Sequence, residues 1–317
     1  MKPAIPQVDL HDFLSADPKR KQDFIQDLGV AFSDIGFVAL RGHFLTPELI
    51  TKLYKEVRLF FELPETVKMK YHLPGLAGQR GYTPFGSETA KGFNQADLKE
   101  FWHFGQYLSP KDVGEFSYPE NVNVEELPDF NTVGKEVFQA LEKTATEVLK
   151  AIAHYLELTP NYFVPFVTNG NSILRPIHYP PITEAPKNAV RAAAHGDINL
   201  ITLLMGAQGS GLEVQNRTGE WIPAQAQEDE LMINMGDMMA RLTNNKLKST
   251  IHRVVNPPKE LWGESRFSIP FFMHPVATMP LNCLANCISD THQKQYDDIT
   301  AGEFLHERLV DLGLIKK

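Results

Sequence analysis

Short apolar runs separated by turn residues follow one another closely between Ile198 and Met273. The runs cover residues 198–204, 212–215, 221–223, 230–235, 252–255 and 266–273, with turn residues at 209–211, 216–219, 236–237 and 243–245. Runs of this length and spacing predict antiparallel strands. Their succession is typical of a double-stranded β-helix, the double-sheet jelly roll, whose mouth is a natural place for a small ligand.

Helical apolar spacing characterises the part of the chain before these strands. Residues 19–33 and 47–61 have this spacing, and a short strand is expected between them at 37–40. Residues 131–156 carry one apolar stripe, which predicts a long helix packed against the sheet. The predicted fold class is α+β, mainly β: a jelly-roll core with an amino-terminal helical region and a long supporting helix.

The length and composition favour one elaborated domain. A chain of 317 residues with 43% hydrophobic content can bury a substantial core. We expect a single catalytic domain over residues 1–317. It would comprise an amino-terminal helical and mixed region at 1–130, the jelly-roll core at about 170–275 and a carboxy-terminal extension at 276–317.

The charge balance argues against nucleic acids and anionic membranes as partners, because 31 Lys+Arg against 39 Asp+Glu leave a net charge of -8. The start at residues 1–6 lacks the apolar run of a signal peptide, and no later segment approaches the length needed to cross a bilayer. We therefore expect a cytoplasmic protein. Cys283 and Cys287 are expected to be free thiols, since their spacing favours neither a disulfide framework nor a zinc site.

His195, Asp197 and His252 are the candidate metal ligands. On an extended segment residues i and i+2 project to the same side, so His195 and Asp197 can converge on one ion while His252 arrives from elsewhere. Two imidazole nitrogens and one carboxylate oxygen form the arrangement typical of non-haem Fe(II) enzymes that activate oxygen. A zinc hydrolase is the competing interpretation of the same ligands.

Arg266 and Ser268 form a candidate carboxylate receptor. On a strand the two side chains share a face, and a guanidinium beside a hydroxyl suits the far end of a dicarboxylate.

Several ordered motifs make the chain resemble the isopenicillin N synthase-like branch of the Fe(II)/2-oxoglutarate-dependent dioxygenases. They are H-G-D at 195–197, G-L-E-V at 211–214, G-E-W-I-P at 219–223, I-N-M-G-D at 233–237, K-S-T-I-H-R-V-V at 248–255 and R-F-S at 266–268. Upstream, R-G-Y-T-P-F-G at 80–86 and D-L-K-E-F-W-H at 97–103 resemble the amino-terminal half of that family. The resemblance covers nearly the whole chain.

The resemblance implies a site and a reaction. The metal triad would hold Fe(II), and Arg266 with Ser268 would bind the distal carboxylate of 2-oxoglutarate. With dioxygen, such an enzyme hydroxylates, desaturates or cyclises a small organic substrate and forms succinate and carbon dioxide. Tyr179 is expected to hydrogen-bond the cosubstrate carboxylate, although Ile177 stands where the family carries Asn. His178 is expected to be a partly buried strand histidine rather than a fourth ligand.

Two further alternatives remain open at this point. An oxidase of the isopenicillin N synthase or aminocyclopropane-carboxylate oxidase kind would use Fe(II) and oxygen without 2-oxoglutarate, and the loss of Asn at Ile177 is compatible with it. A non-catalytic, metal-dependent binding module for a small molecule is the other, because a fold alone does not determine function.

The partner is expected to be a small-molecule substrate, and no motif names it. Six residues are candidate substrate contacts because of their positions relative to the matched motifs: Arg80, Tyr82, Phe85, His103, Arg175 and Phe272. Arg80 or Arg175 would suit a carboxylate on the substrate. The oligomeric state is not encoded in these motifs.

Overall fold

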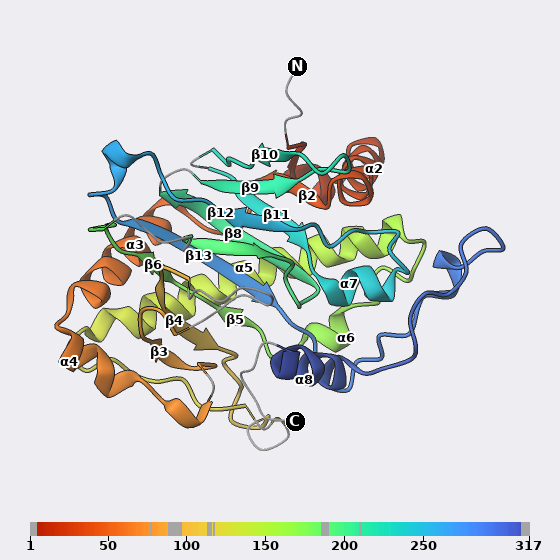
Figure 1. The fold of residues 1–317 in the computed structure, drawn as a ribbon. Helices are drawn as coiled ribbons and strands as arrows, with labels where there is room; N and C mark the ends of the chain where they lie inside the picture. Colours follow the sequence, from red (N-terminus) through yellow and green to blue (C-terminus); the bar gives the residue numbers. More distant parts are fainter. Residues whose placement is uncertain are drawn as a thin grey trace.

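Two stacked β-sheets form the core of the computed structural model (Figure 1). The structure describes residues 5–76, 78–87, 97–112, 116, 118–184, 190–208, 211–227 and 229–311. Nine strands make the larger sheet, in the order β1-β2-β11-β8-β13-β5-β4-β3, with β6 paired to β13 and β4. Four strands make the smaller sheet, in the order β10-β9-β12-β7. The mainly β, jelly-roll class predicted from the sequence is confirmed.

The strands are short, as their turn spacing predicts. The larger sheet contains β1 (Gln7–Asp9), β2 (Phe37–Arg41), β3 (Gly81–Thr83), β4 (Glu100–Gly105), β5 (Ile173–Leu174), β6 (Ile177–Tyr179), β8 (Ile201–Gln208), β11 (Leu231–Met235) and β13 (Arg266–Met273). The smaller sheet contains β7 (Ala192–His195), β9 (Leu212–Gln215), β10 (Trp221–Pro223) and β12 (His252–Val254).

The amino-terminal region contributes directly to the larger sheet. Strand β2 pairs antiparallel with β11 on one side and parallel with β1 on the other. Helices α2 (Pro18–Asp34) and α3 (Pro47–Glu62) precede and follow β2 in the chain. Each begins at a side-chain cap: Asp17 accepts from the backbone N–H of Lys19 at 2.8 Å, and Thr46 accepts from the backbone N–H of Leu49 at 3.2 Å. Such caps satisfy backbone donors that the first helical turn leaves unpaired.

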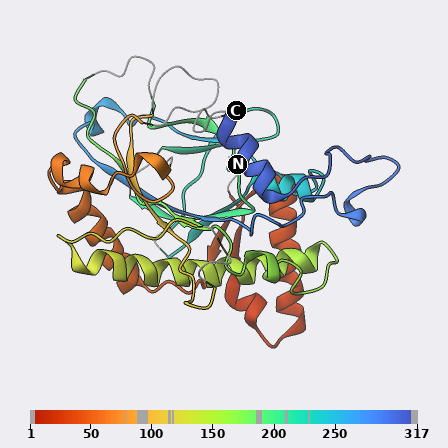
Figure 2. The ribbon, with the colours of Figure 1, turned by 90° about the horizontal axis from the view of Figure 1, so that it is seen from below.

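The long helix α5 (Pro128–Tyr155) covers one face of the larger sheet, and Figure 2 shows it running along one side of the sheets. Its buried stripe includes Val137, Phe138, Leu141 and Val148, all fully buried. Phe138 meets Phe271 of β13 edge to face, with ring centroids 5.0 Å apart. Each large apolar side chain buried in this way stabilises the fold by roughly 1.5–3 kcal/mol, so the expected supporting helix is also a main part of the core.

The remaining helical elements are short. They are α1 (Leu10–Leu14), α4 (Glu65–Lys68), α6 (Val164–Val167), α7 (Asp237–Leu242), α8 (Ala301–Asp311) and the 3-10 turns η1 (Met69–Tyr71), η2 (Pro74–Leu76), η3 (Lys259–Leu261) and η4 (Ala285–Cys287). Among the residues described, no helix combines the length and the apolar character that crossing a bilayer requires.

Two local predictions were wrong. The run at 198–204 becomes strand only from Ile201, because the backbone carbonyls of Ile198 and Asn199 accept from Met238 of α7 and not from a neighbouring strand. Residues 236–237 do not form a simple turn: Gly236 is extended and Asp237 begins α7, with the backbone N–H of Met238 bonded to Ile198. Tertiary contacts therefore override the turn signal there. Gly209 and Ser210, expected in another turn, lie outside the described residues.

We predict that Gly29→Ala destabilises the protein. A Cβ at Gly29 in α2 would lie 2.0 Å from the ring of Tyr155 in α5, so the two helices would have to separate. Overpacking of this kind costs typically about 1–3 kcal/mol, which should lower the melting temperature. Gly263→Ala is the matched control, because a Cβ there meets nothing within 4 Å. Equal melting temperatures for the two variants would contradict the predicted contact.

Candidate functional site

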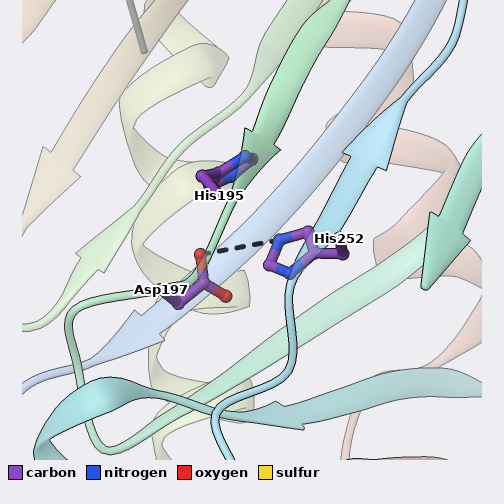
Figure 3. Close-up of side chains that lie close together, drawn as sticks. All are labelled: His195, Asp197 and His252. Carbon is purple, nitrogen blue, oxygen red and sulfur yellow. Dashed lines mark ion pairs between the residues drawn. The ribbon is translucent and has the colours of Figure 1, made fainter. Parts of the chain in front are cut away.

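His195, Asp197 and His252 converge at the open end of the smaller sheet (Figure 3). His195 is the last residue of β7 and His252 the first of β12, and the two are direct partners across the antiparallel pair. Asp197 follows two residues after His195, beyond the end of the strand. One possible ligand atom from each residue lies within 4.8 Å of the others, and Asp197 Oδ1 is 3.8 Å from His252 Nε2.

Backbone carbonyls orient both imidazoles. His195 Nδ1 lies 2.7 Å from the carbonyl oxygen of Ala193, and His252 Nδ1 lies 3.2 Å from that of Thr250. Because a carbonyl oxygen can only accept, the network assigns the proton to each Nδ1. Each Nε2 then keeps its lone pair, which is the form in which histidine binds a metal.

The Asp197 carboxylate is held by two donors from the larger sheet. Its Oδ2 accepts from Thr202 Oγ1 at 2.6 Å and from Asn234 Nδ2 at 2.7 Å. Thr202 on β8 and Asn234 on β11 are themselves partners across their strand pair, so both donors sit at one level of the sheet. Oδ1 remains on the side of His252, where it can serve as a ligand.

The protonation states also suit a divalent metal. Burial, helped by the neighbouring His252, lowers the pKa of the His195 imidazole to about 4. Burial alone would raise the pKa of the Asp197 carboxyl, but the two histidines and its two hydrogen bonds hold the pKa below its usual value. A neutral imidazole and an ionised carboxylate are the forms that bind a metal.

The triad lies in a cavity between the two sheets. Strands of both sheets and β2 of the amino-terminal region contribute to its wall. Its lining consists of Phe37, Lys99, Arg175, Ile177, Tyr179, Ala192, His195, Asp197, Thr202, Leu204, Leu212, Asn234, His252, Val254, Arg266, Ser268, Pro270 and Phe272. Nine of these eighteen residues are polar or charged, and convergent polar groups set among apolar ones are typical of a small-molecule site.

Arg266 and Ser268 form the polar end of this cavity, side by side on β13 as their spacing predicts. The Arg266 side chain is 1% exposed, and its Nε and Nη1 have no hydrogen-bond partner within the described chain. Its guanidinium lies 5.0 Å from the ring centroid of Tyr179, the partner of Arg266 across β6 and β13. A buried, unsatisfied cation is costly unless an anion completes it, so this end of the cavity fits a carboxylate.

Strand β6 directs its residues to opposite faces. Ile177 and Tyr179 line the cavity. His178 points away from it and bonds Glu100 Oε1 at 2.7 Å and Ser265 Oγ at 3.0 Å. This placement of His178 agrees with the expectation that it is not a fourth ligand. Ile177, which stands where the resembled family carries Asn, is an apolar part of the cavity wall.

Of the six candidate substrate contacts, Arg175 and Phe272 line the cavity. The Arg175 guanidinium lies 4.5 Å from the ring centroid of Phe101 and 5.2 Å from that of Phe272. Its Nε donates to His103 Nε2, so His103 orients Arg175 without itself lining the cavity. Burial and the charge of Arg175 hold the pKa of His103 well below its usual value, which keeps the ring neutral and able to accept.

The other three candidates do not line this cavity. Arg80 is fully buried and donates through Nε to the carbonyl oxygen of Pro119 at 3.0 Å. Tyr82 is buried and donates its hydroxyl proton to Glu100. Phe85 is 51% exposed.

Several lining residues were not among the candidates from the sequence. Asn234 lies within the I-N-M-G-D motif, and Thr202 lies in the strand that follows Asp197. In both cases a polar residue within an apolar strand was the signal that could have indicated a role in the site. Lys99 lies within the D-L-K-E-F-W-H motif, but no polar residue in an apolar strand marks it. Its Nζ donates to Asp97 Oδ2 at 2.8 Å, and Asp97 Oδ1 accepts from the backbone of Ala193 at 3.1 Å.

Comparison with protein families matches two segments of the chain. Residues 170–275 match the sequence model of the 2OG-Fe(II) oxygenase superfamily, and residues 5–126 match that of the non-haem dioxygenase in morphine synthesis N-terminal region. Among curated relatives, a proline hydroxylase of Petromyces alliaceus is 30% identical over 96% of this chain and 98% of the relative. A 2-oxoglutarate-dependent dioxygenase of Monascus ruber is 34% identical over 84% of each.

Solved structures give the same picture. A putative 2OG-Fe(II) oxygenase family protein from Caulobacter crescentus is 43% identical, with a TM-score of 0.87 over 98% of this chain and 99% of that one. A full-length Neurospora crassa protein, solved in complex with alpha-KG and thymine, is 29% identical, with a TM-score of 0.83 over 96% of each chain.

We predict that Thr202→Val weakens Fe(II) binding. The change removes one of the two donors that hold Asp197 Oδ2, and the loss of such a supporting bond typically costs about 10–100-fold in metal affinity. Anaerobic titration of the metal-free protein with Fe(II) measures the effect. Thr83→Val is the matched control, because Thr83 is also buried and lies on β3, outside the cavity lining. Asp197→Ala should abolish tight binding, and unaltered affinity in Thr202→Val would refute this role.

Proposed function

The chain belongs to the 2OG-Fe(II) oxygenase superfamily, and from this premise we propose that His195, Asp197 and His252 hold the iron while Arg266, Ser268 and Tyr179 bind 2-oxoglutarate. The protein is an Fe(II)- and 2-oxoglutarate-dependent dioxygenase that oxidises a small organic substrate, with formation of succinate and carbon dioxide. When bound together, Fe(II) and 2-oxoglutarate supply the activation of dioxygen.

One observation carries the assignment of the cosubstrate end: Arg266 is buried in the same cavity as the triad with two nitrogens unsatisfied. A dicarboxylate that reaches from the triad to Arg266 would complete that guanidinium with a charge-assisted bond, and the Ser268 hydroxyl can add a second. This chemistry and the family favour 2-oxoglutarate over the two alternatives left by the sequence, an oxidase without it and a non-catalytic module.

The protein's own groups would then position, orient and enclose the reactants. His195 and His252 offer Nε2 and Asp197 offers Oδ1, and their outer hydrogen bonds keep these atoms aimed at one point. The rings of Phe37 and His252 meet edge to face with their centroids 5.7 Å apart, and Phe37 forms part of the cavity wall beside the triad. The apolar side chains around the triad exclude water, which protects reactive species from side reactions.

Arg175 is the proposed anchor of the primary substrate. It places a permanent positive charge on the cavity wall between the rings of Phe101 and Phe272. A guanidinium in such a setting suits a carboxylate or paired carbonyl oxygens. The Neurospora crassa relative was solved in complex with thymine, a small ring with carbonyl groups. The proposed substrate class is therefore a small molecule with an acidic or carbonyl group.

We also propose that the chain acts as one catalytic domain rather than as separable halves. Strand β2 lies between β1 and β11 in the core sheet, and Phe37 at its start lines the cavity. Removal of the amino-terminal region would therefore expose an edge of the sheet and open the site.

Arg266→Gln should weaken 2-oxoglutarate binding by about 30-fold or more, because removal of one partner of a buried charge pair costs at least about 2 kcal/mol. Bidentate chelation of Fe(II) by a 2-oxo acid gives a visible charge-transfer band, so anaerobic titration with 2-oxoglutarate measures the dissociation constant. Arg217→Gln, which removes an exposed arginine paired with Asp34, is the control. Wild-type protein that binds Fe(II) but develops no band would overturn the cosubstrate assignment.

Arg175→Gln should reduce the preference for acidic substrates. We would screen small carboxylic acids and their neutral amides for stimulation of succinate formation and compare each acid with its own amide. In wild-type protein the acids should be preferred, and the ratio should fall by about tenfold in the variant, which is the effect of losing one charge-assisted bond. An unchanged ratio would show that Arg175 does not contact the acidic group.

A further inference from the structure

Arg191 is a second buried arginine beside the cosubstrate end of the cavity. It immediately precedes β7 and is 3% exposed. Its Nη2 donates to the backbone carbonyl oxygen of Glu264 at 3.1 Å, while its Nε has no partner within the described chain. This acceptor is a neutral backbone carbonyl, and the Glu264 carboxylate attracts the charge of Arg191 less strongly than Arg266 repels it.

Arg191 and Arg266 approach the same aromatic ring from the two different sheets. The guanidinium carbons lie 5.9 Å and 5.0 Å from the ring centroid of Tyr179. Arg191 immediately precedes β7 of the smaller sheet, the strand that ends at His195, whereas Arg266 and Tyr179 are cross-strand partners in the larger sheet. In the part of the chain that the structure describes, neither arginine forms an ion pair with a carboxylate.

Arg191 and Arg266 together have three nitrogens without a hydrogen-bond partner in the described chain. Two buried positive charges also repel each other, and both effects destabilise the fold. Burial, followed by the charge of Arg266, lowers the pKa of Arg191, in keeping with this repulsion. A bound anion would relieve both costs at once. The fold itself does not require such a pair. A chain that kept Arg191 bonded to Glu264 and carried an apolar residue in place of Arg266 would fold at a lower cost in free energy.

We propose that Arg191 is a positioning and specificity-determining residue for the cosubstrate: it adds a second positive charge behind Arg266 and Tyr179 and thereby selects 2-oxo acids that carry a distal carboxylate. Arg191 does not line the cavity, so it acts through the field at that end and through the two residues in front of it. The inference rests on the proposed function, since it requires that Arg266 receives the distal carboxylate of 2-oxoglutarate.

The test compares two 2-oxo acids that chelate Fe(II) in the same way. 2-Oxoglutarate carries a distal carboxylate and 2-oxobutyrate carries none. Anaerobic titration of the Fe(II)-loaded protein, followed by the charge-transfer band, gives a dissociation constant for each without turnover. Arg191→Gln should raise the constant for 2-oxoglutarate about tenfold, equivalent to about 1.4 kcal/mol, and leave that for 2-oxobutyrate within about twofold.

Arg191→Lys separates charge from structure. Lysine keeps the positive charge but loses the guanidinium geometry that reaches Glu264, so it should restore most of the selectivity if charge is the cause. If Arg191 only supports the fold, Arg191→Lys should behave like Arg191→Gln. If Arg191→Gln fails to fold, Arg191→Lys alone serves as the test. Its preference for 2-oxoglutarate over 2-oxobutyrate should then stay close to that of the wild type, and loss of that preference would contradict the inference.

Coupling to Arg266 provides a second readout. In an Arg266→Gln background the added change Arg191→Gln should cost much less than tenfold, since the carboxylate is then no longer held in place. Equal effects of Arg191→Gln on both 2-oxo acids, or no effect on either, would overturn the inference. These results differ from a failure of the proposed function, in which the wild-type protein itself would develop no band with 2-oxoglutarate.

Discussion

The pairing of β7 with β12 is the constraint on which the site depends. It places His195 directly opposite His252, and a slip of one residue would turn either imidazole to the other face. Asp197 leaves the end of β7 and is bonded there by Thr202 and Asn234, which belong to the opposite sheet. The triad therefore ties the two sheets together, because both histidines lie on the smaller sheet and the Asp197 carboxylate is held by residues of the larger one.

Charge is the second constraint, and it acts at the other end of the cavity. Arg266 and Arg191 are both almost fully buried and lie around Tyr179, and neither forms an ion pair within the described residues. The rest of the core is strongly apolar, with α5 packed along the larger sheet. That packing supplies stability in excess of what the buried cations cost, so the fold can hold a binding site that is complete only with an anionic ligand.

Patterns of local spacing predicted most of the elements and the two ends of the site. The H-x-D and R-x-S motifs were readable because two residues two apart share a side of an extended segment. Motif proximity was a poorer guide to the substrate side: Arg80 and Tyr82 belong to a matched motif, yet both are buried outside the cavity lining. Which face a short strand presents depends on the sheet it joins, and the helix at Asp237 likewise depends on contacts with a distant segment.

The sequence by itself determined the fold class, the long supporting helix and the residue types of a metal and carboxylate site, because strand and helix periodicity and short motifs are local properties. Only the tertiary structure decided which distant groups meet. It set His252 against His195, placed Asn234 and Thr202 behind Asp197, and brought Arg191 next to Arg266. Such encounters join residues far apart in the chain, and they follow from strand register and sheet stacking, which no single segment encodes.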